Sequence, residues 1–170
     1  VDYGAGRGLW SCYFAANGFH VQALDVKDTY ECYDFARGDR FFAVEEVVKG
    51  EIGLPLDCSR VLLFMSWPED PNREGSSLYA ARVLSSFRQR GGMCAIYVGQ
   101  GRGGCTASES FFNEVELFFN EEILSEEKKA MQSRSIIAPL DAMWLLSIKD
   151  TSELHPFFRF SSSQEPQLEG

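Results

Sequence analysis

The chain has 170 residues, 45% hydrophobic and 24% charged, a composition typical of one globular domain and not of a disordered chain. Sixteen Lys and Arg stand against 25 Asp and Glu, giving a net charge of −9. This balance argues against general binding to nucleic acid, because phosphate contacts come from Lys and Arg. The longest apolar run, residues 60–68, is far shorter than the ~18 residues of a membrane span.

The cysteines show no CxxC spacing and are odd in number, which argues against a zinc knuckle or a disulfide framework. They are Cys12, Cys32, Cys58, Cys94 and Cys105. Two histidines do not suggest a metal site either, so we predict no metal. Free cysteines favour a reducing, cytoplasmic location. The chain begins at Val1 inside an apparent motif, and we expect its natural start to lie upstream.

Strand and helix patterns alternate along the first half of the chain. In order they predict the end of a strand at 1–3, a glycine-rich loop at 4–8, a helix at 9–16, a strand at 19–26, a helix at 28–37 and a strand at 40–48. The helix at 9–16 should end at Asn17-Gly18, because glycine adopts the left-handed conformation of a helix C-cap.

The second half continues the alternation. It predicts a buried strand at 60–65, a helix at 76–90, a strand at 93–98, a second glycine-rich loop at 99–105, an acidic helix at 108–132 and strands at 135–138 and 143–149. The aromatic stripe of the acidic helix should face the core. Its members are Phe111, Phe112, Val115, Phe118 and Phe119.

This order predicts an α/β fold, doubly wound, with a mostly parallel sheet. The last two strands should form an antiparallel hairpin, because residues 139–141 are too few for a crossover helix. We expect one domain over residues 1–160 and a disordered tail over 161–170, which is rich in Ser, Gln, Glu and Pro. Ligands of such folds bind at the carboxyl ends of the strands.

The first motif is Asp2-x-Gly4-x-Gly6-x-Gly8, and an acid, Asp25, ends the next predicted strand. Glycines allow close approach of the backbone to a ligand, and an acid about 20 residues on can hold a ribose diol. The dinucleotide fingerprint G-x-G-x-x-G would need glycine at position 9, where this chain has leucine.

The G-x-G-x-G loop, with its acid two residues earlier, resembles motif I of the class I S-adenosylmethionine-dependent methyltransferases. The resemblance implies a Rossmann-like fold of seven strands whose first helix and most of whose first strand would precede Val1. Asp2 and the glycine turn would face the methionine part of the cofactor, Asp25 the ribose, and Glu51 the adenine amino group, with Glu45 as a rival. The cofactor-binding residues that it implies are Asp2, Gly4, Ala5, Gly6, Gly8, Asp25, Val26, Glu51 and Ser66.

The second motif, Ser66-Trp67-Pro68-Glu69, follows the fourth predicted strand, where this family places the methyl acceptor. Family members that methylate nucleic-acid amines carry Asn/Asp-Pro-Pro-aromatic here, and this departure argues against a nucleic-acid substrate. Trp67 would line the site of an apolar or cationic substrate, or pack in the core. Glu69 would be a general base, or a solvated acid in a turn.

The third motif is the loop at 99–105, in which Arg102 adds a positive charge that could bind a carboxylate or phosphate. The alternative is a flexible connection with a buried Cys105. Together with Ser66-Trp67-Pro68, this loop is similar to a group of methyltransferase-like proteins without an assigned substrate.

The resemblance implies methyl transfer from S-adenosylmethionine to an O, N or S acceptor, which the acidic charge suggests is a small molecule or a protein. Such reactions depend chiefly on proximity, so no catalytic residue is assigned. Two alternatives stay open: a non-catalytic scaffold or partner-binding domain, and an oxidoreductase that uses a nicotinamide dinucleotide.

Overall fold

The computed structural model describes residues 1–26, 41–48, 51–68, 79–124, 129 and 141–149. Strands and helices alternate through most of these ranges. The elements are β1 Asp2–Tyr3, α1 Leu9–Ala16, β2 Ala23–Val26, β3 Glu45–Val47, β4 Leu62–Ser66, α3 Tyr79–Gln89, β5 Cys94–Gly99, α4 Glu109–Phe118, β6 Phe119–Ile123 and β7 Ala142–Ile148. The predicted helix at 28–37, the strand at 135–138 and the tail at 161–170 lie outside the described residues.

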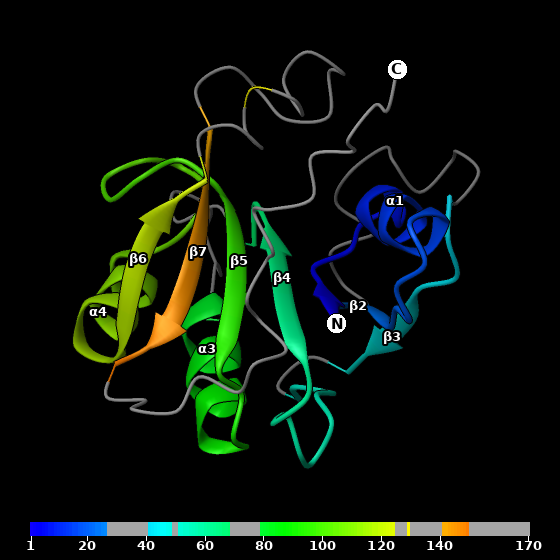
Figure 1. Cartoon of the computed structure of the whole chain (residues 1–170), viewed down its shortest axis with the longest axis horizontal. Helices are drawn as coiled ribbons and strands as arrows, with labels where there is room; N and C mark the ends of the chain where they lie inside the picture. The colour runs from blue at the N-terminus through cyan, green and yellow to red at the C-terminus, as the bar shows by residue number, and fades with distance from the viewer. Residues whose placement is uncertain (27–40, 49–50, 69–78, 125–128, 130–140, 150–170) are drawn as a thin grey trace, which may run out of the picture.

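The seven strands form one sheet in the order β3-β2-β1-β4-β5-β7-β6. Figure 1 shows it running from β6 at one edge to β3 at the other. Neighbours from β3 to β5 pair in parallel, whereas β7 is antiparallel to both β5 and β6. The predicted mostly parallel α/β sheet with a C-terminal antiparallel pair is therefore confirmed.

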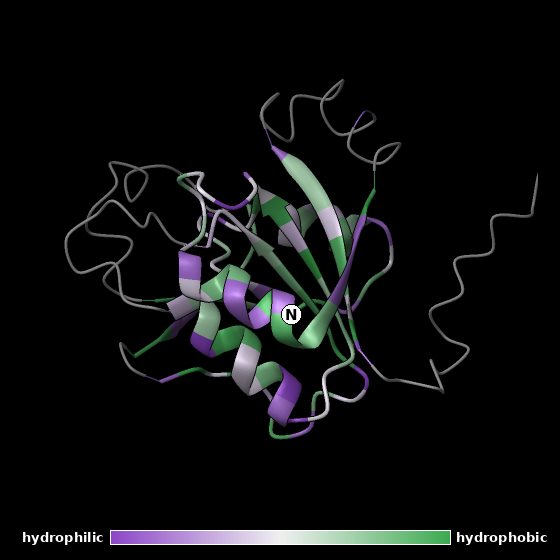
Figure 2. Ribbon diagram, turned by 90° about the vertical axis from the view of Figure 1, so that its left-hand side faces the viewer, coloured by the Kyte–Doolittle hydropathy of each residue, from purple (hydrophilic) through white to green (hydrophobic). Residues whose placement is uncertain are grey.

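Helices cover both faces of the sheet. Side chains alternate along β4, because successive residues of a strand point to opposite faces: Leu63 and Met65 join the cluster that contains the buried side of α3 and α4, whereas Phe64 packs with Trp10 of α1. Figure 2 shows mostly hydrophobic central strands and helices that also carry hydrophilic segments. No helix of the described residues is long and apolar enough to cross a lipid bilayer.

Helix α1 has the bounds that its sequence predicts, because its signals are local. Gly8 precedes it with φ 78°, and at its end Asn17 donates a side-chain hydrogen bond to the Tyr13 carbonyl at 2.8 Å. Gly18 then takes φ 86°, as the predicted left-handed cap requires. The strands β2 and β3 are shorter than predicted, at four and three residues.

The acidic helix is much shorter than predicted, and the sixth strand lies elsewhere. Helix α4 begins as expected after the N-cap Ser108 but ends at Phe118, and Phe119–Ile123 pairs with β7 as strand β6. The prediction of a hairpin closed by residues 139–141 was therefore wrong, since the connection spans residues 124–141. The apolar pattern typical of a helix continues through Phe119 in the sequence. The helix ends at Phe118 because the next residues pair with β7.

The assignment of Phe119 to a core position of β6 can be tested by truncation. Phe119 is 1% exposed and the nearby Leu117 is 66% exposed. Phe119→Ala should lower the free energy of unfolding by about 3–5 kcal/mol, because it leaves a cavity in the core. Leu117→Ala should lower it by no more than about 0.5 kcal/mol. Urea denaturation measures both, and equal losses would contradict the burial of Phe119 and the exposure of Leu117.

Candidate functional site

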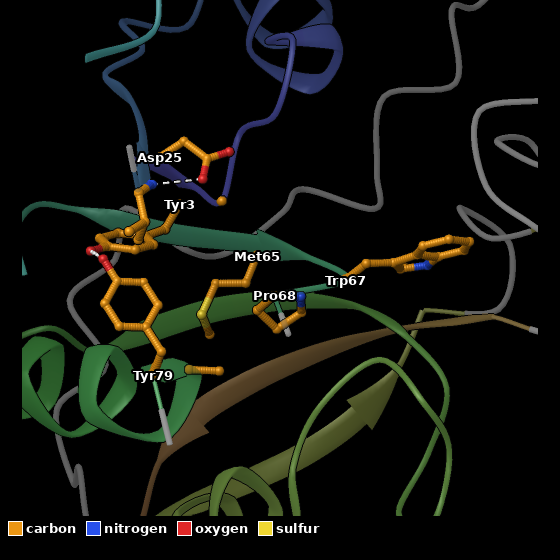
Figure 3. A pocket seen from close by; sticks show the side chains of 9 residues that line it. Tyr3, Asp25, Met65, Trp67, Pro68 and Tyr79 are labelled. Carbon is orange, nitrogen blue, oxygen red and sulfur yellow. Dashed lines mark hydrogen bonds between the residues drawn. The ribbon is translucent and has the colours of Figure 1, made fainter. Parts of the chain in front are cut away.

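A pocket lies at the carboxyl ends of β1, β2 and β4, where the first helix turn of α3 closes it. Figure 3 shows the side chains that line it. The lining residues are Tyr3, Gly4, Asp25, Val26, Met65, Trp67, Pro68, Tyr79 and Ala80. Of the predicted cofactor residues, the structure therefore brings Gly4, Asp25 and Val26 together with two predicted substrate residues, Trp67 and Pro68.

The turn between β1 and α1 is held by its own backbone N–H groups. Those of Gly4 and Ala5 both donate to the Leu24 carbonyl, at 2.8 and 3.0 Å. That of Gly6 donates to the Asp25 carboxylate at 2.6 Å, and that of Gly8 donates to the Ala5 carbonyl at 2.8 Å. These four N–H groups therefore already have acceptors within the protein. The turn offers a ligand chiefly a surface of suitable shape.

The three glycines of the turn differ in what surrounds them. All have positive φ, at 74°, 55° and 78° for Gly4, Gly6 and Gly8, which side chains other than glycine rarely adopt. A Cβ on Gly6 would meet nothing within 4 Å, and one on Gly4 would lie 4.0 Å from Pro68 Cα. A Cβ on Gly8 would lie 2.7 Å from Phe42 Cβ. Gly4 and Gly6 therefore leave open space, whereas Gly8 allows the chain after β2 to pack against the turn.

Asp25 is the third residue of β2 and lies beside this turn. It is buried, and besides Gly6 its carboxylate accepts the N–H of Val26 at 2.7 Å, a bond drawn in Figure 3. These bonds hold the carboxylate at the pocket wall. A carboxylate held in this way can accept hydrogen bonds from a diol.

Asp2 lies behind the turn instead of lining the pocket. Its carboxylate accepts the Ser11 hydroxyl at 2.6 Å and the Ser11 backbone N–H in the first turn of α1. Burial raises the pKa of the Asp2 carboxyl to about 6, against the lowering effect of these bonds. The protein therefore places a carboxylate of its own at the start of α1, where the helix dipole favours negative charge.

Two tyrosines form a polar pair in the pocket that the sequence reasoning missed. The hydroxyl groups of Tyr3 and Tyr79 hydrogen-bond each other, as Figure 3 shows, and Tyr79 also donates to the Glu51 carbonyl at 3.4 Å. Burial raises the pKa of both hydroxyls, so both stay neutral at physiological pH. They can donate or accept hydrogen bonds but do not serve as bases. A buried tyrosine usually needs such a partner, which was the available signal.

A second contact lies on the other side of the β4 end. The indole N–H of Trp67 donates to the Asp141 carboxylate at 2.6 Å. Asp141 precedes β7 and is buried, and no local pattern in the sequence singles it out. Ser66, the residue before Trp67, ends β4 in register with Val98 of β5 and is not part of the pocket lining.

Two other predicted residues, Glu51 and Glu45, lie apart from the pocket lining. Glu51 is exposed, with only its carbonyl reaching Tyr79. Its rival Glu45 accepts a hydrogen bond from the Gln22 side chain at 3.1 Å, ahead of β2. Glu69 lies outside the described residues.

Arg102 folds back onto α4. Its guanidinium contacts Glu109, Asn113 and Glu116, so two carboxylates already face the charge that we expected to bind an anion. Cys105 in the same loop is exposed, which contradicts the alternative of a buried thiol. Within the described ranges, no three His, Cys, Asp or Glu side chains are grouped so as to hold a metal ion.

Comparison with known proteins gives no family. No protein-family model matches the chain, and no curated protein matches it.

Gly8 and Gly6 form a matched pair for testing the turn. Gly8→Ala combines positive φ with a clash against Phe42 and should lower the free energy of unfolding by about 2–4 kcal/mol. Gly6→Ala meets open space and should lower it by about 1–2 kcal/mol, from backbone strain alone. Urea denaturation of both variants measures this, and a smaller loss for Gly8→Ala would contradict the packing described.

The raised pKa of Asp2 predicts a pH dependence of stability. The native state binds this proton more tightly than the unfolded state, whose pKa stays near 3.8. The contribution of Asp2 to stability is therefore fully present below pH 3.8 and is lost as the pH rises to about 6. Asp2→Asn removes the titration, so it should gain about 3 kcal/mol relative to wild type across this range.

Chemical denaturation at several pH values checks this prediction, and Asp57→Asn gives a control of opposite sign. The Ser59 N–H bonds the exposed Asp57 carboxylate and lowers its pKa, so Asp57→Asn should lose stability relative to wild type as the pH rises. A difference between wild type and Asp2→Asn that does not change with pH would refute the assignment.

Proposed function

We propose that this domain binds S-adenosylmethionine in the pocket at the ends of β1, β2 and β4 and transfers its methyl group to an acceptor. The observation that carries the proposal is the Asp25 carboxylate, fixed by the Gly6 and Val26 N–H groups at the pocket wall. A ribose diol would bind this carboxylate, and the open space at Gly4 and Gly6 would admit the rest of the cofactor.

The electrostatics of the turn favour this cofactor over a dinucleotide. In dinucleotide-binding folds the pyrophosphate sits on the first helix N-terminus. Here the Asp2 carboxylate, behind the turn, already bonds the Ser11 hydroxyl and N–H in the first turn of α1, and the Gly4, Ala5 and Gly6 N–H groups already have acceptors. A pyrophosphate would meet a negative charge and engaged donors. S-adenosylmethionine carries no phosphate, and its sulfonium is positive.

The sheet supports the same choice. A Rossmann-like methyltransferase sheet ends in a pair that contains one antiparallel strand, and in this chain β7 is inserted antiparallel between β5 and β6. The dinucleotide-binding order 3-2-1-4-5-6 has no such strand. This supports the resemblance carried by residues 2–26.

The chemistry that the cofactor would supply when bound is an electrophilic methyl group. The residues of this chain would bind and orient the cofactor. Asp25 would hold the ribose, and the Tyr3 and Tyr79 hydroxyls would contact the cofactor from the pocket wall. The net charge of −9 favours a small molecule or a protein over a nucleic acid as the acceptor.

Calorimetry with S-adenosylhomocysteine tests the cofactor site on wild type, Asp25→Asn and Asp57→Asn. We expect wild type to bind with a dissociation constant in the micromolar range. Asp25→Asn should bind at least tenfold more weakly, since hydrogen bonds to a charged group contribute about 1.5–3 kcal/mol. The exposed Asp57→Asn carries the same chemical change away from the pocket and should bind like wild type.

Thermal unfolding of each variant shows that it is folded, and NAD is titrated alongside. Absence of S-adenosylhomocysteine binding to folded wild type would overturn the proposal and favour a non-catalytic scaffold. Tighter binding of NAD would favour the oxidoreductase.

A further inference from the structure

Two unusual features of the chain meet in one hydrogen bond. Among the described non-glycine residues, only Trp67 has a positive φ, at 51°. A bulky residue in this conformation costs of order 1–3 kcal/mol and persists only where surrounding contacts hold it. Its contact is the Asp141 carboxylate, to which the indole N–H donates at 2.6 Å.

Asp141 is the second unusual feature. It is 1% exposed, and its Oδ1 is the single buried side-chain oxygen or nitrogen of the described residues that lacks a hydrogen-bond partner. Leaving a buried acceptor unpaired costs about 1–3 kcal/mol, and more for a charged group. The hydrogen bond between Trp67 and Asp141 therefore leaves the backbone strain of Trp67 and one unpaired carboxylate oxygen in place. Uncompensated groups of this kind are typical of ligand-binding sites.

The pair lies next to the cofactor pocket. Trp67 follows β4 and belongs to the pocket lining, and Figure 3 shows its ring turned away from Tyr3 and Tyr79. Asp141 directly precedes Ala142, which is paired with Gly99 at the carboxyl end of β5. The pair therefore extends the binding rim from β4 toward β7.

We propose that the Asp141 carboxylate and the Trp67 indole form a binding site for a cationic amine, which would be the methyl acceptor or the part of it that is recognised. Oδ1 lacks a donor, and an ammonium group has several N–H donors and the opposite charge. The indole, 56% exposed, offers the aromatic face that binds cations best. The site rests on the proposed function for its role as an acceptor site, but not for its ability to bind an amine.

Oδ1 is buried, so an amine reaches it only when the groups around it move. Trp67 is 56% exposed and bonds the neighbouring Oδ2, so its ring can turn toward solvent and make room at the carboxylate. A neutral alcohol or a carboxylate of the same shape lacks the charge that compensates for this movement. The site should therefore select by charge.

The test is an NMR titration of the full chain with benzylammonium, benzyl alcohol and benzoate. The Trp67 indole N–H resonance, identified by its loss in Trp67→Phe, is the direct reporter. We expect benzylammonium to shift it with saturation, and benzyl alcohol and benzoate to bind at least tenfold more weakly. Equal shifts with all three probes would contradict the proposal.

Two variants distinguish a specific effect of the Asp141 carboxylate from general attraction of the amine to an acidic protein. Asp141→Asn should weaken benzylammonium binding at least tenfold, whereas Asp57→Asn removes the same charge at an exposed site and should leave it unchanged. Trp67→Phe, followed by backbone resonances near Asp141, keeps an aromatic ring and removes the competing N–H, so it should bind benzylammonium at least as well as wild type. Equal weakening in Asp141→Asn and Asp57→Asn would mean general charge attraction and would overturn the proposal.

S-adenosylhomocysteine affinity, measured on the same samples, distinguishes this inference from the proposed function. Asp141 does not line the cofactor pocket, so Asp141→Asn should bind S-adenosylhomocysteine within about twofold of wild type. Binding of S-adenosylhomocysteine without selective binding of the amine overturns the amine site alone. Selective amine binding without S-adenosylhomocysteine binding overturns the proposed cofactor and leaves the amine site standing.

Discussion

The hydrogen bond from the Gly6 N–H to the Asp25 carboxylate joins the turn after β1 to the end of the neighbouring strand β2, and the rim that these strand ends form around the pocket depends on it. It is the bond that joins the turn after β1 to a side chain at the end of β2. The bonds from Gly4 and Ala5 to the Leu24 carbonyl reinforce the same connection. Because each of these donors is committed to the protein, the turn is rigid before any ligand arrives, which lowers the entropic cost of binding.

Several energetically unfavourable groups lie at or beside this rim. The buried Asp2 carboxyl has a raised pKa, Trp67 holds a left-handed backbone, and Asp141 keeps an oxygen without a described partner. The interior beneath them is apolar and closely packed, with Leu63, Met65 and their neighbours fully buried. A stable core can carry such strain, and groups of this kind are typical of functional sites.

The charged groups of this rim favour one kind of ligand charge, which the glycine pattern alone does not specify. A glycine-rich turn before a helix suits a phosphate in many folds, yet here the helix start is neutralised by Asp2 from within. The pocket and the neighbouring Asp141 both present carboxylates. The rim as a whole therefore suits ligands that are positively charged or rich in hydroxyl groups, in keeping with the acidic balance of the chain.

Local patterns by themselves determined the strand-to-helix turn, the bounds of α1 and the acid at the end of β2, since each depends on residues close in sequence. They also fixed the fold class, because alternating strands and helices with apolar runs leave few arrangements. Only the tertiary structure decided where α4 gives way to β6, since the helical stripe continues through Phe119 and pairing with the distant β7 ends it. The same holds for the Tyr3 contact with Tyr79 and the Trp67 contact with Asp141, whose partners are 76 and 74 residues apart. No periodicity reports such pairs, because each depends on where the sheet places distant segments: Tyr3 meets the first residue of α3, and Trp67 meets the residue before the antiparallel β7.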